Sequence, residues 1–470
     1  MSRSTISARH GIGAMRPRHG RLPALLLTAL LLAGLLALAN RPLAVSAATW
    51  HVPGPGLPDV GSALGRAAEG DEIVLAPGIY RERLTIARRV TLSAADPADP
   101  PVLDGGGQGT VVRIQAPGTR LRGLIIRHSG DDVEARDACI YVHEPAGGVE
   151  LTGNTLGECL FGVWINGAPG VRIVGNRVSG LYKPIASDRG NGLNLWHVRD
   201  ALVRHNVIHD VRDGIYVSVS TASRIEENLM YDLRFGVHYM YNDSNHIKGN
   251  AICASTVGLA MMFSKHLEID GNLAIGNQAH GILFRSVYAS RIHENTVAAN
   301  GKGFFVNDTA DNEITANLVT GNAIGVHITA GSQGDRVYGN VFADNPRQVR
   351  FTQRRDILWD AEGRGNYWSD YLGWDLNHDG RGDRTYRASN RVDALVHRYP
   401  QVKLLAHSPA LQVLQALEAR FPVLRPPSLV DRHPLMRPPP VSPQAPAVTQ
   451  FPEWDAACAT AAATVPKATD

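Results

Sequence analysis

Cysteine is scarce in this chain, and the few cysteines lack the spacing of a metal-binding or redox motif. The 470 residues contain only Cys139, Cys159, Cys253 and Cys458, with no CxxC pair and no Cys/His cluster of zinc spacing. Cys139 and Cys159 are nearly one structural repeat apart, so a bridge between them is conceivable. They occupy different positions of the repeat described below, however, and we therefore expect two free thiols.

An excess of positive charge is also absent once the first 47 residues are set aside. The whole chain has 47 basic and 44 acidic residues and a formal net charge of +3. Residues 1–47 contain six arginines and no acid, which leaves 47 − 6 = 41 basic residues against 44 acidic ones. This slightly negative balance argues against a nucleic-acid-binding protein.

Only one long apolar run is present. It extends from Leu22 to Ala39 and follows five arginines, and Val45-Ser46-Ala47 then offers small residues for cleavage. This pattern is typical of a secretory signal peptide, so we expect residues 1–47 to be removed and the rest to be exported. Retention of the run as an anchor is the alternative. No other stretch is long and apolar enough to cross a bilayer, so we predict no membrane span in the mature chain.

Two landmarks recur through the middle of the chain with the same period. The first is a pair of residues that ends in asparagine, at Asn154, Asn176, Asn206, Asn228, Asn250, Asn272, Asn295, Asn317 and Asn340. The intervals between these asparagines are 22, 30, 22, 22, 22, 23, 22 and 23 residues. The second landmark is a glycine before an apolar residue, at Gly162, Gly192, Gly214, Gly236, Gly258, Gly281, Gly303 and Gly325. Such self-similarity indicates one supersecondary unit stacked on copies of itself.

The repeating unit reads as a coil of short strands. Each repeat holds two apolar alternations, such as residues 214–217, and no segment from 110 to 345 shows a helical stripe. The leucine-rich-repeat pattern is absent. We therefore predict an all-β fold, a right-handed parallel β-helix over residues 48–365. The asparagines suit its turns because they tolerate the left-handed region and can form an internal amide ladder. The 30-residue interval predicts a loop from Leu181 to Gly190.

Both ends of the predicted coil differ from its middle. A short helix at Val60–Ala68 is expected to cover the open N-terminal end. Residues 366–436 form an irregular extension that we expect to act as a cap and docking segment. This extension contains one amphipathic helix, with Ser408 as its N-cap and Pro409 in its first turn. Its apolar stripe consists of Leu411, Leu414, Leu417 and Phe421. The Pro/Ala-rich residues 437–470 are expected to be disordered.

The repeat places two thioether side chains and one imidazole side chain on one outward patch. Met230 and Met261 fall at core positions of the register, whereas Met240 and Met262 fall in an outward row beside His238. We name His238, Met240 and Met262 the Met–His patch. Thioether and imidazole groups suit Cu(I), so the patch is a candidate site for transient copper binding.

The same positions also fit an apolar docking surface. The outward residues that flank the Met–His patch are Trp196, Tyr216, Leu283 and Phe305. A cluster of this kind is typical of a surface covered by a partner. Docking and metal binding are compatible, and the residues alone favour docking slightly.

A second candidate metal site lies in the C-terminal extension. Oxygen ligands at alternate positions, Asp375, Asn377 and Asp379, are followed by a glycine and by Asp383. This resembles the first half of a calcium loop, although Tyr386 stands where an EF-hand has its bidentate glutamate. A hydrated loop of Asx turns is an almost equal alternative.

The coil lacks the residues that sugar-processing β-helix enzymes require. Polysaccharide lyases combine clustered acids for calcium with a basic residue for proton abstraction, and epimerases of this shape carry an Asp-Pro-His-Asp motif. Neither appears on the coil, where Asp243, Asp308 and Asp311 are scattered. We therefore expect no enzymatic activity and no catalytic residues. A polysaccharide-binding or polysaccharide-modifying protein is the alternative function, and a surface adhesin is a third possibility that the lack of an anchor disfavours.

The C-terminal motifs carry a resemblance to a known family. They are Gly365-Asn-Tyr-Trp-Ser-Asp-Tyr, Trp374-Asp-x-Asn-x-Asp-Gly-x-Gly-Asp, Leu404-Leu-x-x-Ser-Pro-Ala and Asp431-x-x-Pro-Leu-Met. With the signal peptide and the Gly/Asn coil, they resemble the NosD family of nitrous oxide reductase maturation proteins over nearly the whole mature chain. The resemblance implies a periplasmic protein that works with an ABC transporter, a copper chaperone and nitrous oxide reductase. It implies help in assembling the copper–sulfur centre of that reductase.

Overall fold

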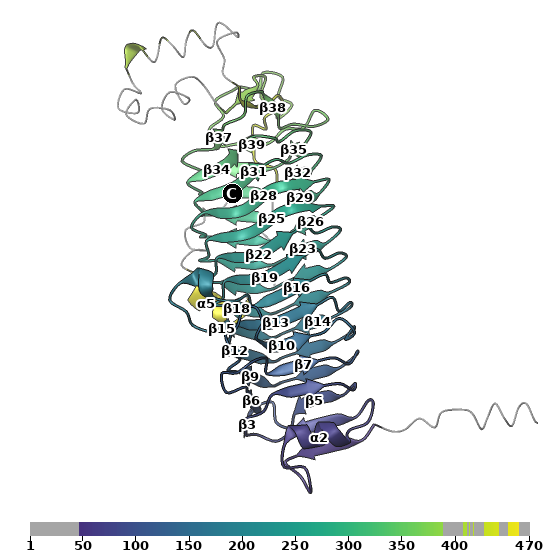
Figure 1. Cartoon of the computed structure of the whole chain (residues 1–470). Coiled ribbons are helices and arrows are strands. Elements are labelled where there is room, and N and C mark those ends of the chain that lie inside the picture. The colour runs from purple at the N-terminus through teal and green to yellow at the C-terminus, as the bar shows by residue number, and fades with distance from the viewer. Residues whose placement is uncertain are drawn as a thin grey trace, which may run out of the picture. The chain divides into compact units, whose positions relative to one another are not determined.

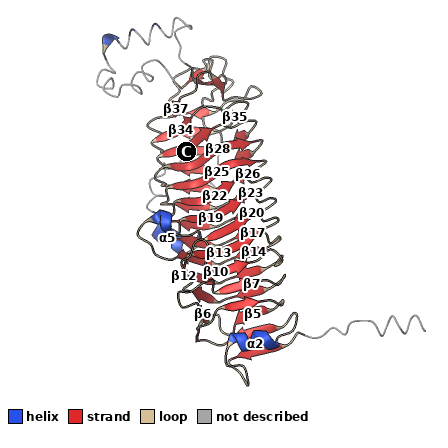
Figure 2. Ribbon diagram, in the orientation of Figure 1, coloured by secondary structure: helices blue, strands red, loops and turns tan. Residues whose placement is uncertain are grey.

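The computed structural model describes residues 47–388, 408–410, 413, 417, 427–440 and 450–459. Three long parallel sheets run along the molecule, and each turn of the chain contributes one strand to each sheet (Figures 1 and 2).

The first sheet has 13 strands and the second has 12. The first sheet contains β1 (Thr49–Val52), β2 (Glu72–Leu75), β5 (Thr91–Ala94), β8 (Arg120–Arg122), β11 (Glu150–Thr152), β14 (Arg172–Val174), β17 (Leu202–Arg204), β20 (Arg224–Glu226), β23 (His246–Lys248), β26 (Glu268–Asp270), β29 (Arg291–His293), β32 (Glu313–Thr315) and β35 (Arg336–Tyr338). The second sheet contains β4 (Leu84–Ile86), β7 (Val112–Ile114), β10 (Ala138–Val142), β13 (Phe161–Asn166), β16 (Leu193–Trp196), β19 (Asp213–Ser218), β22 (Phe235–Met240), β25 (Val257–Lys265), β28 (His280–Tyr288), β31 (Lys302–Asn307), β34 (Ile324–Ile328) and β37 (Val349–Phe351).

The third sheet also has 13 strands, and a small sheet follows it. The third sheet contains β3 (Ile79–Tyr80), β6 (Val102–Asp104), β9 (Ile125–Arg127), β12 (Thr155–Cys159), β15 (Arg177–Gly180), β18 (Val207–His209), β21 (Leu229–Tyr231), β24 (Ala251–Cys253), β27 (Leu273–Ile275), β30 (Thr296–Ala298), β33 (Leu318–Thr320), β36 (Val341–Ala343) and β39 (Tyr367–Trp368). The small sheet contains β38 (Ile357–Leu358), β40 (Tyr386–Arg387) and β41 (Leu429–Asp431). The predicted parallel β-helix is thus confirmed.

The interior of the coil is filled by the inward rows that the repeat predicts. One continuous row on the second sheet consists of Leu195, Val217, Tyr239, Met261, Phe284 and Val306, all buried. Met230 is also fully buried in the core. The assignment of Met230 and Met261 to the core is therefore confirmed. Met240 and Met262 directly follow the buried Tyr239 and Met261, so alternation places them outside.

The predicted asparagine ladder runs inside the coil. Nδ2 of Asn228 donates to Oδ1 of Asn250 at 2.9 Å, and the backbone N–H of Asn228 donates to the same oxygen at 3.1 Å. The same pairing links Asn250 to Asn272 and continues turn by turn. Every rung of the ladder is buried, so each amide satisfies backbone groups that water cannot reach.

In each residue pair of this landmark, the residue with a left-handed backbone conformation is the one that precedes the ladder asparagine. Gly249 has φ +60° and Glu227 has φ +53°, whereas no asparagine of the ladder has a positive φ. The expectation that asparagine itself occupies the left-handed region is therefore wrong. The asparagine is needed for its amide, and the preceding position makes the turn, which explains why glycine is frequent there.

The glycine landmark has a different cause, which is close packing between turns. A Cβ on Gly214 would lie 2.6 Å from the carbonyl oxygen of Gly236, and a Cβ on Gly236 would lie 2.7 Å from that of Gly258. These distances are too short for a side chain. The glycines therefore stack directly on one another along the coil.

The N-terminal end is capped as predicted. Helix α2 (Val60–Arg66) begins after Asp59, whose side chain accepts a hydrogen bond from the backbone N–H of Ser62 at 2.7 Å. Val60 and Ala63 face the core. The predicted loop from Leu181 to Gly190 is also present, since β15 ends at Gly180 and β16 begins at Leu193.

The C-terminal end of the coil lies slightly beyond the predicted residue 365. The asparagine ladder extends to Asn366, which accepts from Nδ2 of Asn340 at 2.8 Å, and β39 pairs with β36. Trp368 then stacks between Phe342 and Tyr386, with ring centroids 4.4 Å apart on each side. The aromatic motif after Gly365 therefore closes the core.

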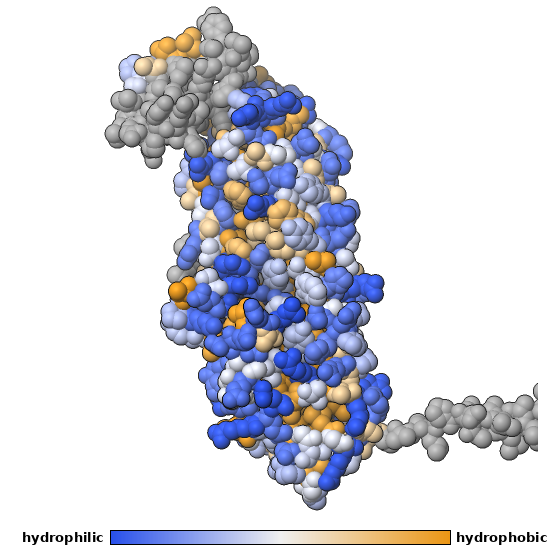
Figure 3. All heavy atoms as spheres, viewed as in Figure 1, coloured by the Kyte–Doolittle hydropathy of each residue, from blue (hydrophilic) through white to orange (hydrophobic). Residues whose placement is uncertain are grey.

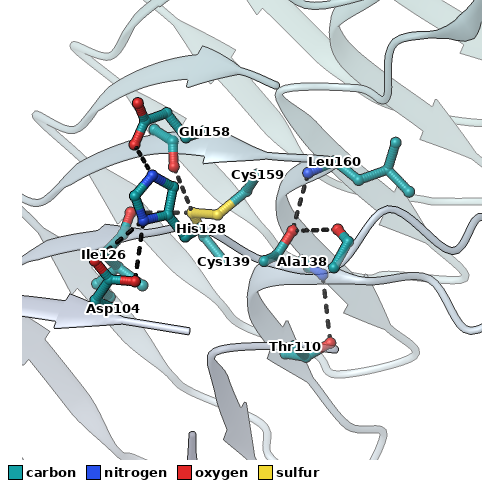
Figure 4. Close-up of a disulfide and its surroundings, with 12 residues drawn as sticks. Asp104, Thr110, Ile126, His128, Ala138, Cys139, Glu158, Cys159 and Leu160 are labelled. Atoms are coloured by element: carbon teal, nitrogen blue, oxygen red, sulfur yellow. Dashed lines mark hydrogen bonds and ion pairs between the residues drawn. A yellow bond between two sulfur atoms is a disulfide. The ribbon is translucent and has the colours of Figure 1, made fainter. Parts of the chain in front are cut away.

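Two disulfides are present, and one contradicts the expectation of free thiols. Cys139 and Cys159 are bonded, with their Cα atoms 5.5 Å apart, and His128 lies beside them between Asp104 and Glu158 (Figure 4). The pairing of β12 with β15 shifts register between Leu156 and Cys159. Because the expectation rested on a regular register, this bulge explains why it failed.

The second disulfide joins Cys253 to Cys458 and corrects the expectation for the tail. Residues 450–459 include helix α5 (Glu453–Ala457), which contradicts the expectation of disorder for this part of 437–470. Trp454 packs on outward apolar residues of the third sheet, including Leu229. Arg177 bonds Glu453 at 2.9 Å. The segment is thus fastened to the outside of the coil, at the position of α5 in Figure 1.

Candidate functional site

The outward face of the second sheet brings the candidate residues together. One outward row consists of Tyr216, His238, Ala260, Leu283, Phe305 and His327. The neighbouring outward row consists of Ser218, Met240, Met262, Arg285 and Asn307. Successive members of a row are separated by about 4.8 Å, the spacing between strands. Both rows have the register that the sequence predicts.

Met240 and Met262 are direct partners on adjacent strands. Met240 lies on β22 opposite Met262 on β25, and both are half-buried. The next member of the row is Arg285, which is exposed and whose guanidinium lies 5.5 Å from the centre of the Phe263 ring. The two thioethers are therefore available on the surface, with a positive charge on one side.

His238 lies on the same strand as Met240 but is more deeply buried. Its Nδ1 lies 3.0 Å from Oδ2 of Asp213, which is also held by Arg234. Burial by itself would raise the pKa of Asp213, but the hydrogen bonds and charges of His238 and Arg234 lower it. Asp213 is therefore ionised at neutral pH.

The four docking residues predicted on the coil lie on this face. Trp196 is 43% exposed, and Tyr216, Leu283 and Phe305 are half-buried. In the view of Figure 3, apolar side chains gather over the upper-middle turns of the coil, at the level of β22–β31 in Figure 1. The structure thus places these residues around the Met–His patch.

An aromatic groove borders the patch at the corner between the second and first sheets. Tyr241 and Phe263 follow Met240 and Met262 in the chain, and their rings stack with centroids 5.1 Å apart. Tyr241 is 58% exposed. A groove of about 400 Å³ runs along these rings to Tyr288. Sequence reasoning missed this corner, although the aromatic residues directly follow the methionines.

Two further histidines on this face were also missed. His280 and His327 pack against Phe305 from the adjacent turns, with ring centroids 5.0 and 5.2 Å away. Burial lowers the pKa of each to about 4, with nearby Lys302 contributing to both. Both imidazoles are therefore neutral at neutral pH. His327 could have been found from the sequence, because it follows Gly325 by two residues as His238 follows Gly236.

The candidate calcium loop is exposed, and its carboxylates accept hydrogen bonds from the loop's own backbone. Asp375 accepts from the N–H groups of Asp379 at 3.2 Å and Gly380 at 2.9 Å. Asp383 accepts from Leu376, while Asn377 accepts from Asp379. The bond to Asn377 is an Asx-turn bond, and the others tie the loop to itself over four to seven residues. Calcium binding by this loop stays a prediction.

The amphipathic helix of the extension lies largely outside the described residues. Leu411, Leu414 and Phe421 belong to that part, and Leu417 is 41% exposed.

Among the residues that the structure describes, no three His, Cys, Asp or Glu side chains are grouped so that they could hold a metal ion. Within the same residues, no helix has the length and apolarity to cross a membrane.

Comparison with known proteins gives relatives along most of the chain. A family model described as "Periplasmic copper-binding protein (NosD)" matches residues 174–373. A "Probable ABC transporter binding protein NosD" from Pseudomonas aeruginosa is 42% identical over 381 residues, which are 78% of this chain and 88% of that protein. The protein of the same description from Stutzerimonas stutzeri is 38% identical over 374 residues, 76% of this chain and 85% of the relative.

Solved structures show likeness of the fold alone. The N-terminal fragment of bacteriophage Phi29 gene product 12 superposes with a TM-score of 0.51 at 11% identity, covering 71% of this chain and 68% of that one. At this identity the similarity extends to the coil and not to its side chains.

Proposed function

Since this chain belongs to the NosD family, we propose that it is a periplasmic accessory protein for assembly of the copper–sulfur centre of nitrous oxide reductase. It acts with an ABC transporter and receives copper from a chaperone. It has no catalytic activity of its own, and residues 1–47 serve as its export signal. The descriptions of the relatives support the periplasmic, copper-binding and transporter parts of this proposal, and favour it over a polysaccharide-binding role.

The observation that carries the copper part is the pairing of Met240 with Met262 beside His238. Copper(I) is the cargo, and it prefers thioether and imidazole donors over carboxylates. Neighbouring strands place the two sulfurs on one surface, and the only described contact of the His238 ring nitrogens is through Nδ1. The donor set therefore fits a soft monovalent ion. Arg285 beside Met262 opposes a bound cation, which favours brief contact over storage.

Two surfaces serve for docking in this proposal. Trp196, Tyr216, Leu283 and Phe305 surround the Met–His patch and receive the protein that delivers or accepts copper, which supplies the missing ligand. The C-terminal extension receives the transporter. There the loop after the core-closing aromatics exposes Leu372, which is 91% exposed, Trp374 and Leu376. Burial of such side chains by a partner is favourable.

The test is a triple substitution of the patch, His238→Ser, Met240→Leu and Met262→Leu. We expect the fold and transporter binding to survive, while nitrous oxide reductase accumulates without its copper–sulfur centre. Met261→Leu is the matched control, because it removes a neighbouring sulfur that points into the core. Normal maturation of the reductase by the triple variant would show that the patch is only a docking surface.

A further inference from the structure

Three hydrogen bonds hold the carboxylate of Asp213, which is fully buried at the start of β19. Arg234 donates from Nε to Oδ1 at 2.8 Å and from Nη2 to Oδ2 at 2.6 Å. The Nδ1 atom of His238 lies 3.0 Å from Oδ2. Parallel pairing of β19 with β22 brings the three groups together across adjacent turns. A two-pronged guanidinium contact of this kind fixes the carboxylate in one orientation.

This arrangement decides which nitrogen of the His238 ring carries the proton. Both oxygens of the Asp213 carboxylate accept from N–H groups of Arg234, so the carboxylate is an acceptor in this cluster and Nδ1 is the donor in the contact with His238. In a neutral imidazole the proton on Nδ1 leaves the lone pair on Nε2. The nitrogen on the far side of the ring from Asp213 is therefore the one that can bind a cation.

Two aromatic rings restrict rotation of the imidazole. Tyr216 contacts the His238 ring edge-on from the preceding turn, with centroids 4.9 Å apart. Phe235 contacts it at 4.8 Å, also nearly at right angles. A flip of the ring would put Cδ2 in the place of Nδ1, which would break the bond to Asp213 and disturb both contacts. The ring orientation is thus set by packing as well as by the hydrogen bond.

We infer that Asp213, fixed by Arg234, is a positioning residue that holds His238 in the Nδ1–H form and so presents Nε2 as the ligand nitrogen of the Met–His patch. The inference rests on the copper function proposed above. A carboxylate behind a histidine ligand commonly fixes the tautomer and orientation of that ligand, and its loss typically lowers metal affinity by about 10- to 100-fold. Asp213 plays this part without touching the cargo.

The first experiment measures the tautomer directly. Proton–nitrogen correlation spectra of the ¹⁵N-histidine-labelled protein, assigned with His238→Ser, should show Nδ1 protonated and Nε2 unprotonated. In Asp213→Asn, Arg234 retains the amide oxygen and the amide nitrogen donates to Nδ1, so the proton should move to Nε2. Asp210→Asn is the control, because Asp210 bonds the neighbouring His209 at 2.8 Å on the exposed surface. A proton on Nε2 in the unsubstituted protein, or an unchanged tautomer in Asp213→Asn, would overturn the inference.

The second experiment measures Cu(I) affinity by competition with a chromophoric chelator. Asp213→Asn should weaken binding by about 10-fold or more, whereas Asp210→Asn should stay within about 2-fold of the unsubstituted protein. If Met240→Leu/Met262→Leu weakens binding but Asp213→Asn does not, the positioning inference is wrong and the copper function stands. If the double methionine variant binds Cu(I) as well as the unsubstituted protein, the proposed copper site is wrong. The inference that Asp213 positions a copper ligand is then wrong as well. A lowered melting temperature without a change of tautomer would identify Asp213 as merely structural.

Discussion

Replacing Asn250 with alanine should destabilise the coil locally and severely. The Asn250 side chain accepts from the backbone N–H and Nδ2 of Asn228, and its own Nδ2 donates to Asn272 at 2.9 Å and to the carbonyl of Ile225 at 2.8 Å. At about 1 kcal/mol for each of these four bonds, the expected loss is roughly 4 kcal/mol. The backbone N–H of Asn228 has no water to replace its partner, because the site is fully buried.

Hydrogen exchange of the Asn228 backbone amide is the most direct assay, because a stacked coil can open one turn at a time. Protection of that amide should fall by about a thousandfold, which corresponds to the expected 4 kcal/mol, and the denaturation midpoint should fall with it. Asn377→Ala, on the exposed C-terminal loop, serves as the control and should change neither quantity appreciably. A loss below about 1 kcal/mol with unchanged protection at Asn228 would refute the view that the ladder satisfies backbone groups.

Three further predictions concern the outer surface. Cys458→Ser should release the segment 450–459, because only a short helix and a few side chains remain to hold it, and limited proteolysis should then cut there while the coil stays intact. Arg285→Gln should raise Cu(I) affinity a few-fold at low salt and less at high salt, since it removes a positive charge beside the patch, and the chelator competition assay measures this. His280 and His327 have folded pKa values of about 4 against an ordinary 6.5, so the unfolded chain binds more protons between those values and stability should fall as the pH is lowered from 6.5 to 4. The double His→Gln variant should flatten that slope in denaturant titrations, and an unchanged slope would contradict the shifted values.

The sequence by itself determined the coiled fold and which residues of each strand point inward or outward. A 22-residue period and a two-residue alternation suffice, because stacked turns make each position of the repeat a ladder on one face. This is why the sequence alone assigns Met230 and Met261 to the core and Met240 and Met262 to the surface.

The tertiary structure decided what breaks the repeat or joins distant parts of it. The bulge in β12 brings Cys159 to Cys139, and a regular register cannot reveal it. The bond between Cys253 and Cys458 spans 205 residues and depends on where the tail returns to the coil. The burial of His238 against Asp213 follows from three side chains on neighbouring turns. Periodicity specifies the direction in which a side chain points, but the charge or ring that it meets depends on the packing between turns.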